Sequence, residues 1–238
     1  GPHSARPAYD QIVQAYSGAM SITGPDANTP TRAGIPIGDL GSGLYSVIGI
    51  LAALLSREQT NKGQHIDMSL LDVQISLLTY MATMQTLSNI DPEPIGNAHF
   101  VHVPYNSFTT QNGFVVIAVI TDAFWEALLE VINIDSLRDP KFSKSVDRLK
   151  NQEFIESELN KVLSTKPSDY WIKALNEAKV PCGPINTFSQ ALSDEQVVHR
   201  EMLVEVEHPD GGKVKMPGNP VKLSYTDEVS YAPPPHLG

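Results

Sequence analysis

The 238-residue chain has little cysteine and few basic residues, and each shortage narrows what it can do. Its one cysteine, Cys182, cannot form an intrachain disulfide, which suits a reducing compartment. We therefore expect a cytoplasmic location, or the mitochondrial matrix if the source is eukaryotic. Lysine and arginine number 17 against 27 acidic residues, and the net charge of −10 argues against nucleic acid as the principal ligand.

Long apolar runs are also missing. No run reaches the roughly 18 residues of a membrane span, since Leu44 to Leu55 is short and contains a glycine, so no membrane partner is expected. Hydrophobic residues still make up 41% of the chain, enough for one large or two modest domains with real cores. Residues 1–4, Gly-Pro-His-Ser, are predicted to be an expression scar left by a protease site.

Several common catalytic signatures are absent. The chain has no serine nucleophile elbow, no Walker loop and no dinucleotide fingerprint. His99 and His102 are three apart, but no cysteine or carboxylate is placed to complete a ligand set, so we expect no metal. Cys182 lies in a Pro-Cys-Gly-Pro turn rather than at a helix start, which favours a structural role over a nucleophilic one.

What the chain does have is a single carboxylate, Asp39, among the four glycines of residues 34–43, directly before an apolar helix predicted from Leu44 to Arg57. A helix start favours the ionised form of a nearby carboxylate, and the glycines leave room for a substrate and for unusual backbone conformations. An approachable aspartate suits nucleophilic catalysis, with Tyr9, Gln11 and the 96–108 loop as possible neighbours. The alternative is that Asp39 only caps the helix, and spacing alone favours that alternative.

Hydrophobic periodicity predicts two regions, separated near residues 91–104 by three prolines and a glycine. Before this boundary we expect a short helix within 9–24, the apolar helix 44–57 buried on all sides, a half-buried strand 64–70 and a helix 72–87. After it we expect a strand at 115–120, a helix capped by Asp122, helices at 146–163 and 168–178 with Ser168 at the cap, and a hairpin pairing 203–208 with 213–216. The predicted fold class is a helix-rich α/β piece followed by a smaller α+β domain.

A set of short motifs occurs in a characteristic order along nearly all of residues 5–238. They are Tyr9-Asp10, Ser17-Gly18, Thr23-Gly24-Pro25, Gly38 to Gly43, Gly49 to Leu54, Gly63 to Leu71, Pro104 to Phe108, Asn112-Gly113, Phe124-Trp125, Val180 to Asn186, His208-Pro209 and Pro233 to Pro235. With these motifs the chain resembles the family III CoA-transferases (CaiB/BaiF type), which include formyl-CoA and carnitine CoA-transferases and α-methylacyl-CoA racemase. The succinyl-CoA:glutarate-like branch looks nearest.

The resemblance implies a domain organisation. Residues 5–90 would be the C-terminal part of a Rossmann-like large domain carrying the catalytic aspartate, residues 91–200 the small α+β domain, and residues 201–238 a segment returning toward the large domain. Family members form interlocked homodimers, so a homodimer is expected. Much of their CoA site lies in an N-terminal half preceding Tyr9, which this chain is expected to lack, together with a final C-terminal helix. The apolar helix faces at Leu44 to Leu55 should then be uncovered.

The resemblance also implies roles for particular residues. Asp39 would be the nucleophile that forms an aspartyl-CoA thioester while CoA passes from an acyl-CoA, such as succinyl-CoA, to an acceptor carboxylic acid. Tyr9 and Gly38 would contact coenzyme A, and Tyr105 and His99 would line the substrate pocket, although an ordinary surface-loop position for His99 is an equal alternative. Oxalate-acting members carry a glycine run where residues 95–99 have one glycine, which disfavours an oxalate-type substrate.

Two other functions stay open at this point. In the racemase branch an aspartate and an upstream histidine act as an acid–base pair on the α-carbon of an acyl-CoA, and that histidine would precede residue 5. The chain could also be a non-catalytic interaction module.

Overall fold

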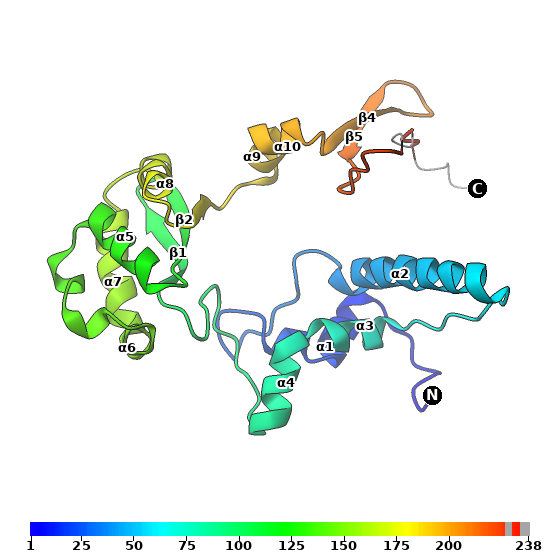
Figure 1. Ribbon diagram of the computed structural model, residues 1–238, viewed down its shortest axis with the longest axis horizontal. Coiled ribbons are helices and arrows are strands. Elements are labelled where there is room, and N and C mark those ends of the chain that lie inside the picture. Colours follow the sequence, from blue (N-terminus) through cyan, green and yellow to red (C-terminus); the bar gives the residue numbers. More distant parts are fainter. Residues whose placement is uncertain (227–229, 234–238) are drawn as a thin grey trace.

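The computed structural model describes residues 1–226 and 230–233, and Figure 1 shows its elements in separate groups along the chain. The first group is helical: α1 (Asp10–Tyr16), η1 (Ala19–Ser21), α2 (Ile37–Thr60), α3 (Leu70–Leu77) and α4 (Thr79–Ser88). The second comprises β1 (Tyr105–Thr110), β2 (Gly113–Ala118), α5 (Asp122–Ile132), η2 (Asp135–Leu137), η3 (Pro140–Phe142), α6 (Ser145–Lys150), α7 (Gln152–Leu163), α8 (Ser168–Glu177) and β3 (Cys182–Pro184). The last comprises α9 (Phe188–Ser193), α10 (Glu195–His199), β4 (Leu203–Glu207) and β5 (Lys213–Pro217).

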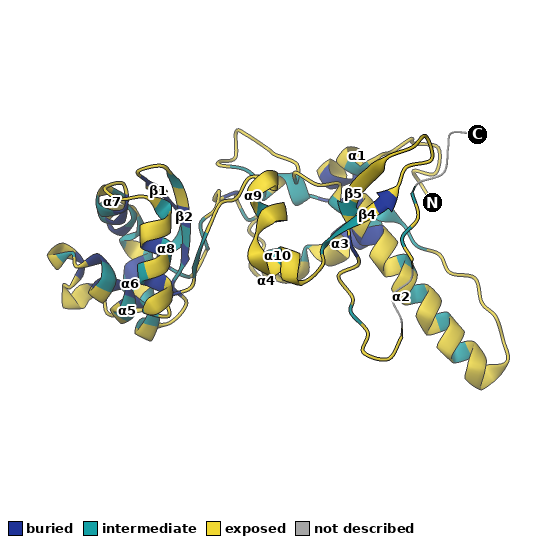
Figure 2. Ribbon diagram, turned by 90° about the horizontal axis from the view of Figure 1, so that it is seen from above, coloured by how far each residue is buried: buried dark blue, intermediate teal, exposed yellow. Residues whose placement is uncertain are grey.

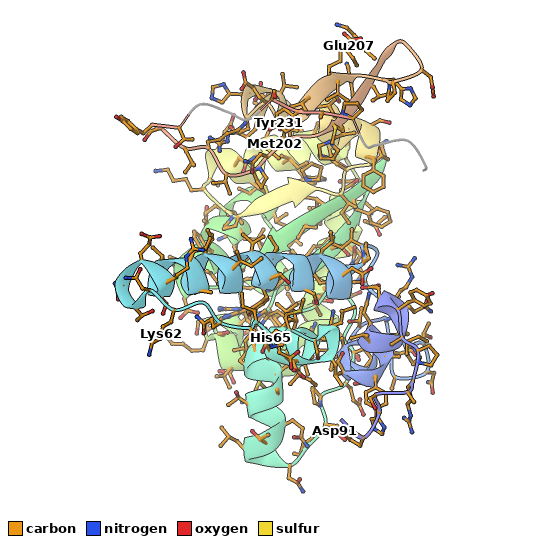
Figure 3. The ribbon with its side chains drawn as sticks, turned by 90° about the vertical axis from the view of Figure 1, so that its right-hand side faces the viewer. Lys62, His65, Asp91, Met202, Glu207 and Tyr231 are labelled. Carbon is orange, nitrogen blue, oxygen red and sulfur yellow. The ribbon has the colours of Figure 1, made fainter. Side chains whose placement is uncertain are left out.

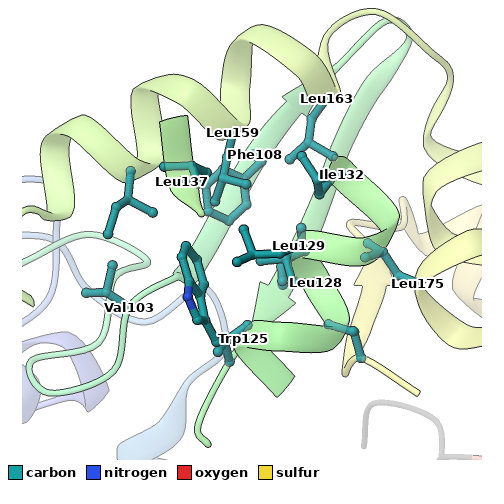
Figure 4. Packing of buried hydrophobic residues seen from close by; sticks show 14 of the residues in the cluster. Val103, Phe108, Trp125, Leu128, Leu129, Ile132, Leu137, Leu159, Leu163 and Leu175 are labelled. Carbon is teal, nitrogen blue, oxygen red and sulfur yellow. The ribbon is translucent and has the colours of Figure 1, made fainter. Parts of the chain in front are cut away.

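The second group contains the main hydrophobic core. Its sheet is antiparallel with the order β1-β2-β3, and Phe108 of β1 pairs with Val115 of β2 across the Gln111-Asn112 turn. Helix α7 packs on β1, and α8 packs on β2 and β3. Seventeen buried apolar residues between Val103 and Val180 form one cluster beneath these elements (Figure 4). The predicted strand near 115–120 and the α+β character of this region are confirmed.

Helix α5 is not capped as predicted. Its N-cap is Thr121, whose side chain accepts a hydrogen bond from the backbone N–H of Phe124. Asp122 instead accepts a hydrogen bond at 2.9 Å from Arg148, a fully buried guanidinium that also donates to the carbonyls of Val103 and Phe142. The Asp122 carboxylate therefore forms an ion pair that joins α5 to α6. Local sequence does not reveal this pairing. Ser168 likewise begins α8 without capping it; the N-cap is Pro167.

The first group is less regular than predicted. No strand forms at Gln64 to Leu70, because no neighbouring strand is present among the described residues to pair with it. This segment runs back along α2 instead, where Lys62 and His65 are labelled in Figure 3. The predicted helix 72–87 is divided into α3 and α4 at Thr79, which has a positive φ of 48°.

Helix α2 is longer than predicted and is not buried (Figure 2). Leu44, Ile48 and Leu55 are 68%, 60% and 69% exposed, so the expectation of a helix buried on all sides is wrong, and the expectation of uncovered faces is confirmed. Among the described residues α2 is also the one helix long and apolar enough to cross a membrane by length and composition, contrary to the sequence-based expectation. Only 17% of that apolar window is buried.

The predicted C-terminal hairpin is present. Strands β4 and β5 pair antiparallel, with Val206 opposite Val214, and the Pro209 to Gly212 turn joins them. Figure 3 labels Met202 and Glu207 in this segment, together with Tyr231, whose hydroxyl accepts a hydrogen bond from the backbone of Asn219. The last two prolines of the Pro233 to Pro235 motif lie outside the described residues.

Candidate active site

Asp39 lies inside the first turn of α2. The helix begins at Ile37, earlier than the predicted Leu44, although glycine disfavours a helix, and Asp10 accepts hydrogen bonds from its first turn. The N-cap is Pro36, so Ile37, Gly38 and Asp39 occupy the first three helical positions. Asp39 is exposed, and among the described residues no hydrogen bond or ion pair engages its carboxylate.

The free N–H groups at the start of α2 are satisfied without the Asp39 side chain. Ile37 donates to the carbonyl of Ile35 at 2.8 Å. Gly38 and Asp39 donate to Oδ1 of Asp10, at 2.8 and 3.3 Å. Pro36 has no N–H to satisfy. The alternative in which Asp39 caps its own helix is therefore wrong: Asp10, from the start of α1, does so.

A buried amide holds Asp10 in place. Gln14, one turn further along α1 and only 1% exposed, donates from Nε2 to Oδ2 of Asp10 at 2.7 Å. Its Oε1 accepts a hydrogen bond from the backbone of Ala33 at 2.9 Å. Helix α1, the loop before α2 and the first turn of α2 are thus tied together. Tyr9, directly before Asp10, is 82% exposed, and Asp10 joins the start of α1 to Gly38 and Asp39.

The four glycines of this stretch serve two different purposes. A Cβ on Gly38 would lie 2.9 Å from Oδ1 of Asp10 and 3.3 Å from Nε2 of Gln74, and one on Gly41 would lie 3.0 Å from Leu77. These two glycines let α1 and α3 approach α2. Gly34 and Gly43 face open space. None of the four has a positive φ, so the expected unusual backbone conformation is not found.

Two buried polar atoms beneath this turn lack a hydrogen-bond partner among the described residues. They are Oγ of Ser42, one turn after Asp39, and Nε2 of Gln74 on α3. Both side chains are nearly inaccessible, at 3% and 2% exposure. Unpartnered buried polar groups are rare in folded proteins. Two of the three found among the described residues lie here, and the third is Nδ1 of His102.

The other predicted pocket residues, His99 and Tyr105, lie together on a different segment. Their rings stack with centroids 5.0 Å apart, and His99 also stacks on Phe100 at 4.6 Å. Nδ1 of His99 accepts hydrogen bonds from the backbone N–H groups of Val101 and His102. Burial, together with the neighbouring His102, lowers the pKa of His99 below its ordinary value.

The hydrogen bonds at Nδ1 indicate the tautomer of His99. Because Nδ1 accepts from two backbone N–H groups, the neutral ring carries its proton on Nε2. Within the described part of the chain no hydrogen bond, ion pair or ring contact joins His99 or Tyr105 to Asp39. The structure joins Gly38 and Asp39 through Asp10, and the roles of Tyr9, His99 and Tyr105 at a substrate site stay predictions.

Sequence reasoning missed Asp10 and Gln14 and instead suggested Gln11, which is exposed. The available signal was a carboxylate and an amide four residues apart on one short helix, a spacing that places both on one face. Cys182 is half-buried, burial raises the pKa of its thiol, and a structural role suits it. No cluster of three or more metal-ligating side chains is found among the residues that the structure describes.

Comparisons with known proteins find similar sequences and structures along nearly the whole chain. The family model of CoA-transferase family III matches residues 1–238. An acetyl-CoA:oxalate CoA-transferase of Acetobacter aceti is 37% identical over 98% of this chain and 59% of its own length. A succinyl-CoA:glutarate CoA-transferase of Mus musculus is 35% identical over 100% of this chain and 55% of its own length. A crystal structure of a CaiB/BaiF family protein from Brucella suis is 32% identical with a TM-score of 0.83, over 95% of this chain and 59% of that one.

The chain thus spans between about half and three fifths of the length of these relatives. The solved relative agrees with the mixed α/β fold. The relatives' names include oxalate as well as glutarate, so the sequence-based preference against oxalate remains a prediction.

Proposed function

Because the chain belongs to CoA-transferase family III, we propose that it forms part of an enzyme that transfers coenzyme A from an acyl-CoA to a carboxylic acid, with Asp39 as the nucleophile. The remaining length of the relatives implies a longer protein, in which the other residues complete the CoA site. Glutarate and oxalate in the relatives' names favour short dicarboxylic acids as acceptors and succinyl-CoA as a donor to try first. A homodimer and the absence of a metal requirement are part of the proposal.

One observation carries the assignment of Asp39. Its carboxylate lies exposed at a helix start whose N–H groups are already bonded to Asp10 and to Ile35. A carboxylate that is neither a cap nor an ion-pair partner is free to attack a thioester carbonyl. The proposal gives Tyr9, which is exposed and adjacent to the capping residue, a contact with the thioester end of the acyl-CoA, and Gly38 a contact with coenzyme A.

The chemistry proceeds through two activated carboxyl groups. A carboxylate oxygen of Asp39 attacks the thioester carbonyl, the C–S bond breaks, and a mixed anhydride and CoA thiolate form. The thiolate then attacks the Asp39 carbonyl, releasing the donor acid as its carboxylate and leaving an aspartyl-CoA thioester. The acceptor carboxylate attacks this thioester, and the same two steps in reverse return Asp39 and the new acyl-CoA. Water must be excluded while the anhydride exists, because hydrolysis would destroy it.

The test uses the full-length protein and a tryptic peptide that contains Asp39. Cleavage after Arg32 and Arg57 releases peptide 33–57, in which Asp39 is the single carboxylate side chain. After incubation with succinyl-CoA, we expect a CoA adduct on this peptide that hydroxylamine removes. Asp39→Asn should abolish both the adduct and turnover, whereas the control Asp67→Asn, exposed and outside α2, should retain both. Normal turnover by Asp39→Asn would refute the mechanism.

A further inference from the structure

At the start of α2, no backbone N–H group of the helix is left free to donate a hydrogen bond to the Asp39 carboxylate. A carboxylate at the third helical position commonly reaches back to the N–H of the N-cap residue. Here the N-cap is Pro36, which has no N–H. The usual partner of a carboxylate in this position is therefore missing.

The remaining donors of the first turn are also taken. Gly38 and Asp39 donate to Asp10, and Ile37 donates to Ile35. Asp10 lies 28 residues away in sequence from Gly38, so this cap is a tertiary contact. It depends on Gly38, since a Cβ there would come within 2.9 Å of the Asp10 carboxylate.

Asp10 is itself oriented by a group that does not reach solvent. Gln14 donates to the second Asp10 oxygen, and its carbonyl oxygen accepts from Ala33, in the loop that leads into α2. The amide therefore orients the cap and the helix entry at once. A flip of the Gln14 amide would break both hydrogen bonds, so its orientation is determined by its two partners.

We propose that Asp10, Gln14 and Pro36 are positioning residues that keep the Asp39 carboxylate uncapped and turned toward substrate. This inference rests on the proposed function of Asp39. The three residues do not touch substrate. They act by removing every donor that would draw the nucleophile back onto its own helix.

The first test restores a donor. Pro36→Ala supplies an N–H at the N-cap, and Asp10→Ala releases those of Gly38 and Asp39. Either change lets Asp39 fold back, so we expect kcat for CoA transfer to fall about 10- to 100-fold while KM for the acyl-CoA stays within about 2-fold. A hydrogen bond to a carboxylate favours its charged form, so the acid limb of the pH–rate profile should move to lower pH in both variants.

A conservative variant separates positioning from mere folding. Asp10→Asn keeps an oxygen acceptor for Gly38 and Asp39 but turns an NH2 group toward Nε2 of Gln14, so its kcat should lie between those of the wild type and Asp10→Ala. Gln14→Leu removes both amide contacts, and its kcat should fall as that of Asp10→Ala does. Asp194→Ala is the matched control: it deletes a carboxylate that caps α10 through Gln196 and Val197, and should leave kcat and the acid limb unchanged.

The outcomes distinguish this inference from the function on which it rests. No adduct on wild-type peptide 33–57 would refute the nucleophile itself. A wild-type adduct combined with unchanged kcat and pH profile in Asp10→Ala and Pro36→Ala would overturn the positioning proposal alone. Loss of kcat that only follows the loss of folded protein, with the acid limb unmoved, would also overturn it.

Discussion

Two regions of the chain differ in how far their apolar side chains are buried. Residues 103–182 bury a continuous cluster beneath a three-stranded sheet, whereas in residues 9–90 only Val13 and Val73 are buried among the hydrophobic residues. Residues 103–182, the second region along the chain, complete their core with their own elements. Residues 9–90, the first region, present a 24-residue helix whose apolar side chains are largely exposed, yet whose first turn is fully hydrogen-bonded.

The difference teaches where the local order of the proposed active site comes from. The turn that carries Asp39 is organised by polar contacts from Asp10 and Gln14, and by glycines that let helices approach, rather than by a hydrophobic core. A site can therefore be locally ordered in a region whose packing is incomplete. Stability and site geometry should respond to different substitutions in the two regions.

The largest effect on stability should come from the core of the second region. Phe108 is fully buried in the cluster shown in Figure 4, so Phe108→Ala should lower the free energy of unfolding by about 3 to 5 kcal/mol. The control Phe188→Ala removes a ring that is 86% exposed and should change it by less than about 0.5 kcal/mol. Urea unfolding followed by tryptophan fluorescence measures both. Equal effects would contradict the assigned core.

The second largest loss of stability should follow from replacing Arg148. Arg148→Met keeps part of the apolar volume but leaves the carbonyls of Val103 and Phe142 and the Asp122 carboxylate without their donor. We expect a loss of about 2 to 4 kcal/mol, because buried acceptors without donors are costly. Urea unfolding measures it, and Lys150→Met, which removes an exposed partner of Asp147, is the control with little expected effect.

The pH dependence sharpens this prediction. The hydrogen bond from Arg148 holds the pKa of Asp122 below its ordinary value of 3.8. A lowered folded-state pKa stabilises the fold above the unfolded-state pKa, and this stabilisation is lost as pH falls through the lowered value. Wild type should therefore lose stability below about pH 4 more steeply than Arg148→Met. Parallel pH profiles of the two proteins would show that the ion pair does not contribute.

A smaller effect is expected in the first region, where one pair of glycines offers a matched comparison. Gly38→Ala and Gly43→Ala both gain helix propensity in α2, roughly 1 kcal/mol each. Only Gly38→Ala also places a Cβ 2.9 Å from Asp10, so it should lose the cap and be less stable than Gly43→Ala by about 1 to 2 kcal/mol. Hydrogen exchange at the first turn of α2 reports this difference. Equal protection in the two variants would contradict a close approach at Gly38.

The smallest effect should come from the uncovered face of α2. Ile48→Ser and Leu55→Ser replace side chains that are 60% and 69% exposed, so the free energy of unfolding of this chain should change by less than about 0.5 kcal/mol each. Self-association of the chain should decrease, because the apolar surface is smaller. Sedimentation velocity measures this. A destabilisation comparable to that of Phe108→Ala would mean that α2 is covered by another part of this chain.

Local patterns predicted the second region well. The β-branched run after Gly113 predicted a buried strand, and the spacing of Trp125, Leu128 and Leu129 predicted a helix with one buried face. Such patterns suffice where neighbouring elements also pack against one another. The ion pair between Asp122 and Arg148 was missed because it joins residues 26 apart in sequence.

The first region was harder to predict for a physical reason. The alternation at Gln64 to Leu70 is a strand pattern, but a strand needs a neighbour, and the described residues offer none there. Asp39 was predicted to be the nucleophile, but that its carboxylate does not cap α2 could not be derived, because this depends on a contact between Asp10 and the start of α2. Local sequence patterns do not predict a contact between residues that are 28 positions apart.

The most direct measurement of the central assignment is the transfer of an oxygen isotope. When an acceptor acid labelled with ¹⁸O attacks the aspartyl-CoA thioester, its oxygen bridges the second anhydride and stays on Asp39 as the new acyl-CoA leaves. In full-length protein quenched during turnover, peptide 33–57 should therefore carry ¹⁸O, and fragmentation should place it on Asp39. Turnover that leaves this peptide unlabelled, or that labels another carboxylate, would contradict Asp39 as the nucleophile.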